Sequence, residues 1–139
     1  MNILTIATIE EDYVSSETAK LLKEKGFKGY SIITIYDEDA ANAYVKELLE
    51  KHLPYSSDDP KLKEFYYTQP TLQMAMKWLR KTHKVFINII YEKSDEVFIA
   101  EVKRPVSGID CWVDNKHNCW FKHEEAAEEA IKFCLERII

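Results

Sequence analysis

Apolar positions in the second half of the chain recur with the period of an α-helix. Between residues 68 and 83 they fall at offsets of 0, 3, 4, 7 and 11, and Pro70 lies in the first turn, where proline is tolerated. We therefore predict a helix over residues 68–83. Its apolar face consists of Leu72, Ala75, Met76, Leu79 and His83.

The period then changes to that of a β-strand. Residues 85–92 and 97–104 alternate between apolar and polar side chains, with a turn at 93–96 and Pro105 as the stop, which predicts a hairpin. Residues 109–113 and 118–121 are typical of two shorter strands on either side of an Asp-Asn-Lys turn. The pattern therefore predicts a second, final hairpin.

A helix is predicted over residues 123–138, at the end of the chain. Its apolar stripe is formed by Ala127, Ala130, Ile131, Cys134, Leu135 and Ile138. Its first turns are acidic, which the helix macrodipole favours, and hold Glu124, Glu125, Glu128 and Glu129. The second half thus predicts an α+β fold: a small antiparallel sheet with helices packed on one face.

The first half carries a well-marked helix over residues 16–25. Ser15 is placed as its N-cap, Val14 is placed to pack on Ala19, and Gly26 suits the left-handed position after the last turn.

Shorter elements complete the first half. Strands are expected at 3–9 and 30–36, and a helix from about 39 to 52 follows the acidic residues 37–39. The apolar face of this helix consists of Ala41, Tyr44, Val45, Leu48 and Leu49. Residues 54–60, bounded by prolines, predict an exposed loop within a single domain over residues 1–139, since neither side alone offers a core of normal size.

The composition is that of a globular protein, with 46% hydrophobic and 31% charged residues among 139. No apolar run reaches the roughly 18–20 residues that span a bilayer, no leader opens the chain, and three cysteines do not form a disulfide framework. We expect a cytoplasmic protein with no membrane partner. The net charge of −5 makes nucleic acid a less expected partner, because attraction to phosphates is a summed field.

One local exception to the acidic balance is a basic stripe on the predicted helix 68–83 and just beyond it. Its members share one helical face and are Lys77, Arg80, Lys81 and Lys84. Such a stripe suits phosphates or an acidic partner, and a solvated helix face is the alternative interpretation.

The helix, three strands, helix order is also that of the double-stranded-RNA-binding fold, which recognises the shape of the duplex through its phosphates. That fold relies on lysines at the start of its final helix, where this chain has His123, Glu124 and Glu125. We therefore expect this chain to share the order of elements of that fold but to lack the lysines with which it binds the duplex.

Potential zinc ligands gather in one short segment: Cys111, His117, Cys119 and His123. Zinc binds nitrogen and sulfur donors tetrahedrally, but this spacing lacks the close cysteine pair of most zinc motifs. Cys111 also fits a strand, where it packs in the core as a small hydrophobic residue. We expect no cofactor, and a zinc site is the weaker alternative.

Catalytic motifs are missing from the sequence. The three glycines form neither a phosphate-binding loop nor a dinucleotide fingerprint, and there is no Gly-x-Ser-x-Gly elbow. Trp112 and Trp120 lie in the predicted final hairpin, and exposed tryptophans are common in protein interfaces. We expect a non-catalytic protein that binds another protein, a homodimer being one form of this, through these tryptophans and the basic stripe. Nucleic-acid binding through the stripe is the alternative.

Three stretches of the chain, 15–27 (SSETAKLLKEKGF), 68–80 (TQPTLQMAMKWLR) and 123–136 (HEEAAEEAIKFCLE), are similar to a group of short uncharacterised proteins. The group belongs to Bacteroides-type gut bacteria and to their phages and prophages, and the resemblance spans most of the chain in the same order. It implies a small intracellular protein of mobile-element origin. The protein-binding or regulatory role is expected from the residues and not from the group. No functional residue is carried over from the group.

Overall fold

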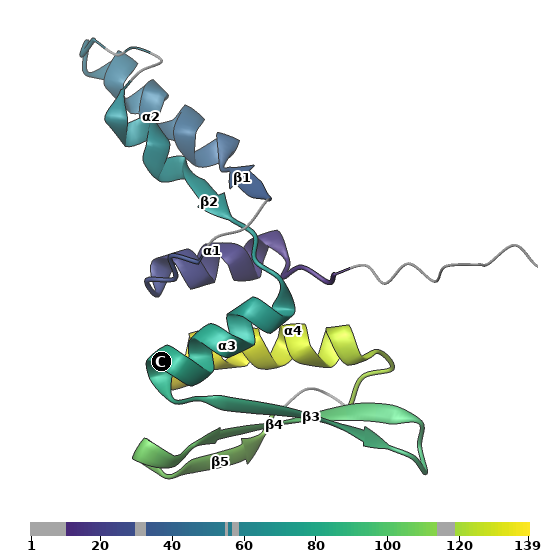
Figure 1. Cartoon of the computed structure of the whole chain (residues 1–139). Helices are drawn as coiled ribbons and strands as arrows, with labels where there is room; N and C mark the ends of the chain where they lie inside the picture. Colours follow the sequence, from purple (N-terminus) through teal and green to yellow (C-terminus); the bar gives the residue numbers. More distant parts are fainter. Residues whose placement is uncertain (1–10, 30–32, 55, 57–58, 114–118) are drawn as a thin grey trace, which may run out of the picture.

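The computed structural model describes residues 11–29, 33–54, 56, 59–113 and 119–139. Most of the chain forms what we call the body, with elements α1 (Ser16–Glu24), α3 (Leu72–His83), β3 (Phe86–Glu92), β4 (Val97–Arg104), β5 (Ile109–Trp112) and α4 (His123–Phe133). These stack as three layers: the sheet, then α3 beside α4, then α1 (Figure 1).

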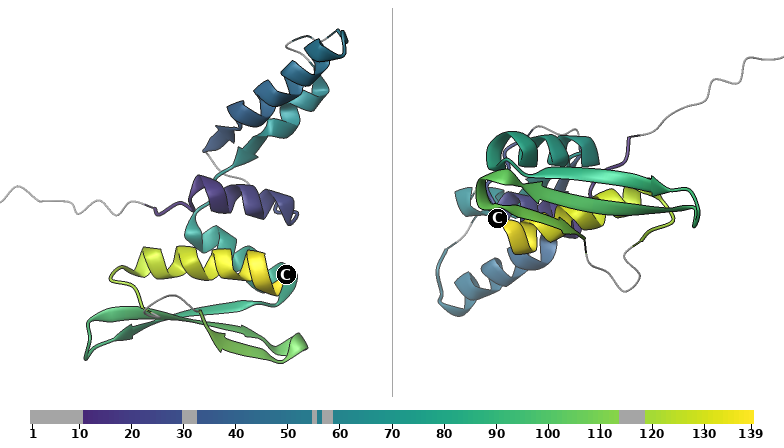
Figure 2. Two further views of the ribbon diagram at one scale, coloured as in Figure 1. Left: turned by 180° about the vertical axis from the view of Figure 1, so that it is seen from behind. Right: turned by 90° about the horizontal axis from the view of Figure 1, so that it is seen from below.

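The rest is an arm, with elements β1 (Thr34–Tyr36), α2 (Glu38–Glu50), the 3₁₀ helix η1 (Pro60–Phe65) and β2 (Tyr66–Thr68). The arm projects from the body in each side view (Figures 1 and 2).

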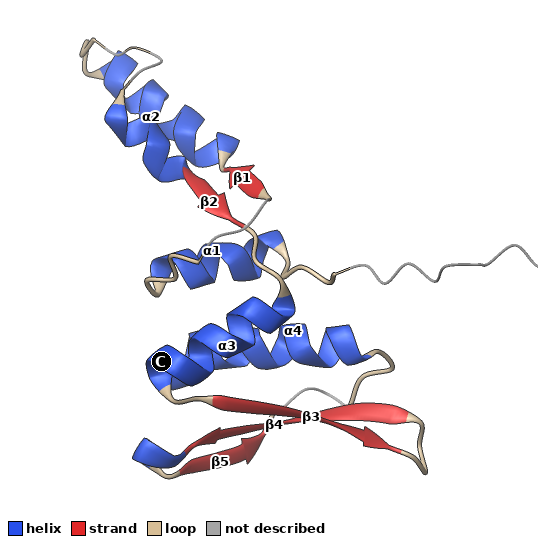
Figure 3. Ribbon diagram, in the orientation of Figure 1, coloured by secondary structure: helices blue, strands red, loops and turns tan. Residues whose placement is uncertain are grey.

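The sheet of the body has the strand order β3-β4-β5, and all its pairs are antiparallel. Ile87 faces Val102 and Ile89 faces Ala100 across the first hairpin. These pairs point toward α3 and α4, since Val102 is 0% exposed and both isoleucines pack against the core. The predicted α+β class is confirmed (Figure 3), and the named elements of the second half run α3, β3, β4, β5 and α4.

The predicted final hairpin is wrong. β5 pairs with β4, with Trp112 opposite Glu101, and Trp120 then forms a bridge with Phe98 of the same strand. Two backbone hydrogen bonds of 2.7 and 2.8 Å join Trp120 to Phe98. Both segments therefore line one edge of β4 instead of pairing with each other. The expected turn at 114–116 and residue 118 lie outside the described residues.

Helices α3 and α4 bury the apolar stripes that the sequence predicts. Leu79 of α3 and Ile131 of α4 are completely buried, and burial of such a side chain is worth about 1.5–3 kcal/mol. The predicted start of α3 is wrong by four residues, because Thr68 ends β2 and the helix begins after Thr71. The Thr71 hydroxyl accepts a hydrogen bond from the Met74 N–H at 3.1 Å, which is an N-cap. Beyond α4, residues Cys134–Ile138 form a π-helical turn.

Helix α1 begins and ends as its cap residues predict. The Ser15 hydroxyl accepts from the Thr18 N–H, and Gly26 adopts a φ of 94°. The N–H of Phe27 donates to Leu22 O at 2.9 Å, which completes a Schellman ending. Val14 and Ala19 are buried in the core, so α1 is the third layer of the body.

The arm forms its own two-stranded sheet, in which Ile35 faces Tyr67, and it does not join the sheet of the body. The predicted strand 3–9 and residues 30–32 lie outside the described residues. Helix α2 begins after Asp37, whose carboxylate accepts from the Ala40 N–H. Pro54 and Ser56 are exposed, and the predicted loop ends where Pro60 begins η1.

The predicted apolar face of α2 is not buried as a core. Ala41 is the buried residue of this helix, whereas the side chain of Leu49 is 59% exposed. The helical period identified the apolar face correctly, but the arm supplies too little chain to cover it.

Candidate functional site

The two tryptophans proposed as contacts lie on opposite faces of the sheet. Trp120 pairs with Phe98, which belongs to the helix-facing set, and it packs against the core. Trp112 follows Cys111, which lies opposite the buried Val102, so Trp112 points to the uncovered face and is 52% exposed. Trp112 and Trp120 therefore do not form one contact surface.

The residues of the basic stripe lie on the last two turns of α3 and at its C-cap, Lys84. All four side chains are exposed and form no ion pair within the described part of the chain: Lys77, Arg80, Lys81 and Lys84. The Lys84 ammonium donates to the Lys81 carbonyl oxygen at 3.2 Å. Because α3 covers the helix-facing side of the sheet, the stripe and Trp112 lie on opposite sides of the body.

The proposed zinc ligands are only partly described. His117 lies outside the described residues, and among the rest no group of three or more His, Cys, Asp or Glu side chains is arranged to hold a metal ion. Cys111 is half-buried in β5, and His123 is exposed, with its ring 5.6 Å from that of Phe98. Burial raises the pKa of the Cys111 thiol, and the neighbouring Asp110 adds to the effect.

The thiol of Cys134 is unsuited to nucleophilic chemistry at neutral pH. Burial among the core side chains of α4 raises its pKa to about 12. The thiolate is the nucleophilic form of cysteine, so this side chain acts as part of the core.

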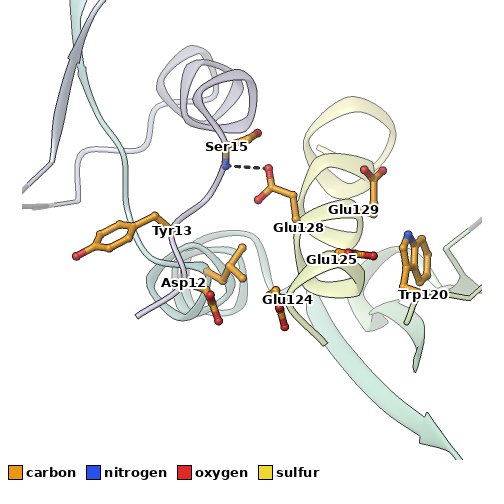
Figure 4. A pocket seen from close by; sticks show the side chains of 9 residues that line it. Asp12, Tyr13, Ser15, Trp120, Glu124, Glu125, Glu128 and Glu129 are labelled. Atoms are coloured by element: carbon orange, nitrogen blue, oxygen red, sulfur yellow. Dashed lines mark hydrogen bonds between the residues drawn. The ribbon is translucent and has the colours of Figure 1, made fainter. Parts of the chain in front are cut away.

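An acidic pocket of about 440 Å³ opens between the start of α4 and the residues before α1 (Figure 4). Its lining residues are Asp12, Tyr13, Ser15, Leu72, Trp120, Glu124, Glu125, Glu128 and Glu129. Glu128 has a defined role there, because its Oε1 accepts from the Ser15 N–H at 2.9 Å and from the Thr18 hydroxyl at 2.6 Å. The second oxygen of this carboxylate is buried and accepts no hydrogen bond from the described residues.

Glu128 thus caps α1 from a distant helix. In a capping box a glutamate at the third helical position accepts from the N–H of the N-cap residue. Here Thr18 occupies that third position, and Glu128 of α4 accepts from both Thr18 and Ser15. Thr18 is completely buried, so its hydroxyl depends on this acceptor. The contact fixes α1 against α4.

The arm is attached to α1 by two lysines. The Lys20 ammonium forms a 2.8 Å ion pair with Asp37, the N-cap of α2. The Lys23 ammonium donates to the Tyr66 carbonyl oxygen at 3.0 Å and to the Glu64 carbonyl oxygen. A cavity of about 300 Å³ lies at this junction, lined by Lys20, Lys23, Glu24, Asp37, Ala40, Glu64, Phe65 and Tyr67.

The most exposed aliphatic side chains of the arm lie at the end of α2 and just after it. We call Val45 and Leu49 of α2, together with Leu53 just beyond its end, the α2 stripe. Leu49 is 59% and Leu53 49% exposed, and Val45 is half-buried. Sequence reasoning missed this surface, because it assigned Val45 and Leu49 to a face that packs inward. The signal was the short, polar chain after the helix, which offers few partners for that face.

Comparison with known protein families, with curated protein sequences and with solved structures finds no match for this chain. The resemblances drawn from the sequence therefore stay expectations. In the described part of the chain, no helix has both the length and the apolar character needed to cross a membrane.

Replacing Glu128 tests the cap of α1. We expect Glu128→Ala to lower the free energy of unfolding by about 1–3 kcal/mol, because the buried Thr18 hydroxyl loses its acceptor. Glu129→Ala is the matched control, since Glu129 is exposed on the same helix. Urea denaturation measures both variants, and equal losses would contradict the role of Glu128.

His83, at the end of α3, predicts a dependence of stability on pH. Burial lowers the pKa of its imidazole, and the charges of Arg104 and Lys25 add to this. A lowered pKa in the folded state means that this contribution to stability is complete above about pH 6.5 and is lost as the pH falls through the folded-state pKa. We expect His83→Gln to flatten the loss of thermal stability between about pH 7.5 and pH 5. His52→Gln, at an exposed site in the arm, is the control, and identical profiles for the two variants would contradict this assignment.

Proposed function

We propose that this is a non-catalytic protein that binds another protein through the α2 stripe. The observation that carries the proposal is the exposure of Leu49 on α2 and of Leu53 just after it, in an arm that projects away from the body. Apolar side chains scattered singly over a surface need no explanation, whereas a row of them on one projecting element favours a contact surface.

The apolar sector of α2 is wider than the chain beside it. On a helix of about 3.6 residues per turn, the directions of Tyr44 and Leu49 differ by about 140°. The η1 helix covers the Tyr44 side, where the Tyr44 ring lies 5.9 Å from that of Phe65 and its hydroxyl donates to Asp59 at 2.6 Å. The Leu49 side receives no such cover, which leaves one edge of the sector open to a partner.

The arm also has the fixed shape that favours binding. Lys20 and Lys23 attach it to α1, and the Tyr36 and Tyr66 rings, 4.6 Å apart, pack across its two strands. A surface that is already ordered loses less conformational entropy when it binds. An amphipathic helix presented in this way supports recognition by a groove or by a second helix.

Photo-crosslinking tests this proposal. A photoreactive residue at position 49 is expected to give adducts of discrete mass in the cell that makes the protein, because a bound partner lies against it. The control is the same residue at position 43, where Ala43 is exposed about 120° around the helix. Leu49→Glu is expected to change the free energy of unfolding by no more than about 0.5 kcal/mol, since the side chain is already exposed. Equal labelling from both positions, or none from position 49, would overturn the proposal.

The basic stripe supports a second candidate function, nucleic-acid binding. The supporting observation is that Lys77, Arg80 and Lys81 share one exposed face of α3, with Lys84 exposed at its C-cap, and that none of the four has a carboxylate partner in the described ranges. If this holds, the protein is retained on duplex RNA or DNA at low salt, and retention weakens as salt rises. Lys77→Glu with Lys81→Glu is expected to abolish retention, and Lys28→Glu with Lys93→Glu, two exposed positions outside the stripe, serves as the control. Absence of retention at low salt excludes this function.

The cytoplasmic location and the mobile-element origin are proposals as well. They are supported by the composition and by the sequence resemblance.

A further inference from the structure

We propose that the partner of the α2 stripe is α2 of a second copy of this chain. The two helices run antiparallel, and the two-fold axis lies between Val45 and Leu49. This inference rests on the proposed function and names its partner. Val45 of one copy therefore lies toward Leu49 of the other. Leu53 follows the end of α2 at Glu50 and the left-handed His52, so it does not continue the helical face.

Charge complementarity supports this pairing. Lys46 and Glu50 lie beside the stripe, on the flank away from Tyr44 and η1. Both are exposed, and neither forms an ion pair within the part of the chain that the structure describes. In an antiparallel pair, like flanks of the two helices face each other. Lys46 of each copy therefore lies close to Glu50 of the other, and the contact occurs twice.

The η1 helix argues against a parallel pair. In parallel helices related by a two-fold axis, one flank of each helix faces the opposite flank of the other. The flank opposite Lys46 is the Tyr44 side, which η1 occupies through Phe65 and Asp59. The free flank is therefore available only to an antiparallel partner.

The position of the stripe fits two complete copies. Helix α2 begins near the body and runs toward the distal end of the arm, so Leu49 lies far from α1 (Figure 1). An antiparallel contact over the last two turns of α2 places the two bodies at opposite ends of the paired arms. The same patch is used by both copies, so association stops at two.

Sedimentation equilibrium of the full chain tests the pairing. A contact between two short helices lies at the small end of protein interfaces, so the measurement covers about 10 µM to about 1 mM. We expect a reversible monomer–dimer equilibrium in this range. Leu49→Glu is expected to abolish association, because it places a charge at the centre of the apolar contact. A monomer at every concentration would overturn the inference.

Charge reversal on the flank tests the antiparallel arrangement. Lys46→Glu and Glu50→Lys each place like charges together, and each is expected to weaken association by about tenfold. An equimolar mixture of the two variants is expected to restore it, since opposite charges then meet between unlike chains. Glu47→Lys is the matched control, because Glu47 forms its 2.7 Å ion pair with Lys51 within the same helix. Failure of the mixture to associate, with circular dichroism showing intact helices, overturns the arrangement.

The crosslinking experiment separates this inference from the proposed function. Adducts from position 49 with the mass of two chains support self-pairing. Adducts with a different protein, from a chain that stays monomeric, overturn self-pairing and leave the proposed function standing. No adduct from position 49 overturns both.

Discussion

The constraint on which the account depends is that helix α2 has a wider apolar sector than the chain beside it can cover. The helix carries an apolar sector about 140° wide from Tyr44 to Leu49, and the six-residue η1 covers one side of it. Helix α4 shows the opposite case: its apolar residues Ala127, Ala130 and Ile131 are fully buried, because the sheet covers one side of the helix and α1 covers part of the rest. Both helices are amphipathic, and the difference lies in how much chain is available to bury them.

A series of polar contacts leads from helix α4 of the body, through α1, to the arm. Glu128 on α4 accepts from Ser15 and Thr18 and so fixes α1 over the helix pair. Lys20 and Lys23 on α1 then hold the first and last segments of the arm. The direction in which the α2 stripe points is therefore set by contacts that begin in the body. These contacts are electrostatic, which makes the arm more sensitive to salt than the core.

Local patterns predicted what local interactions determine. Ser15 and Gly26 mark the ends of α1 because their hydrogen bonds reach only a few residues, and the β3–β4 hairpin joins neighbouring runs. The final hairpin failed because Trp120 pairs with Phe98, far back in the chain. Trp112 lies opposite Glu101 and Trp120 lies opposite Phe98, which is three residues earlier in β4. Because side chains alternate along a strand, an odd step of three along β4 places the two tryptophans on opposite faces of the sheet. Glu128 was interpreted as a charge at a helix start, since nothing local indicates its partners in α1.

Nuclear magnetic resonance spectra of the wild-type chain over a dilution series test the central claim most directly. The amide signals of Val45, Leu49 and Leu53 are predicted to shift with concentration, while those of Lys77 and Arg80 on α3 stay in place. Signals of the α2 stripe that are unchanged from dilute to concentrated protein, or shifts confined to the body, would contradict the account.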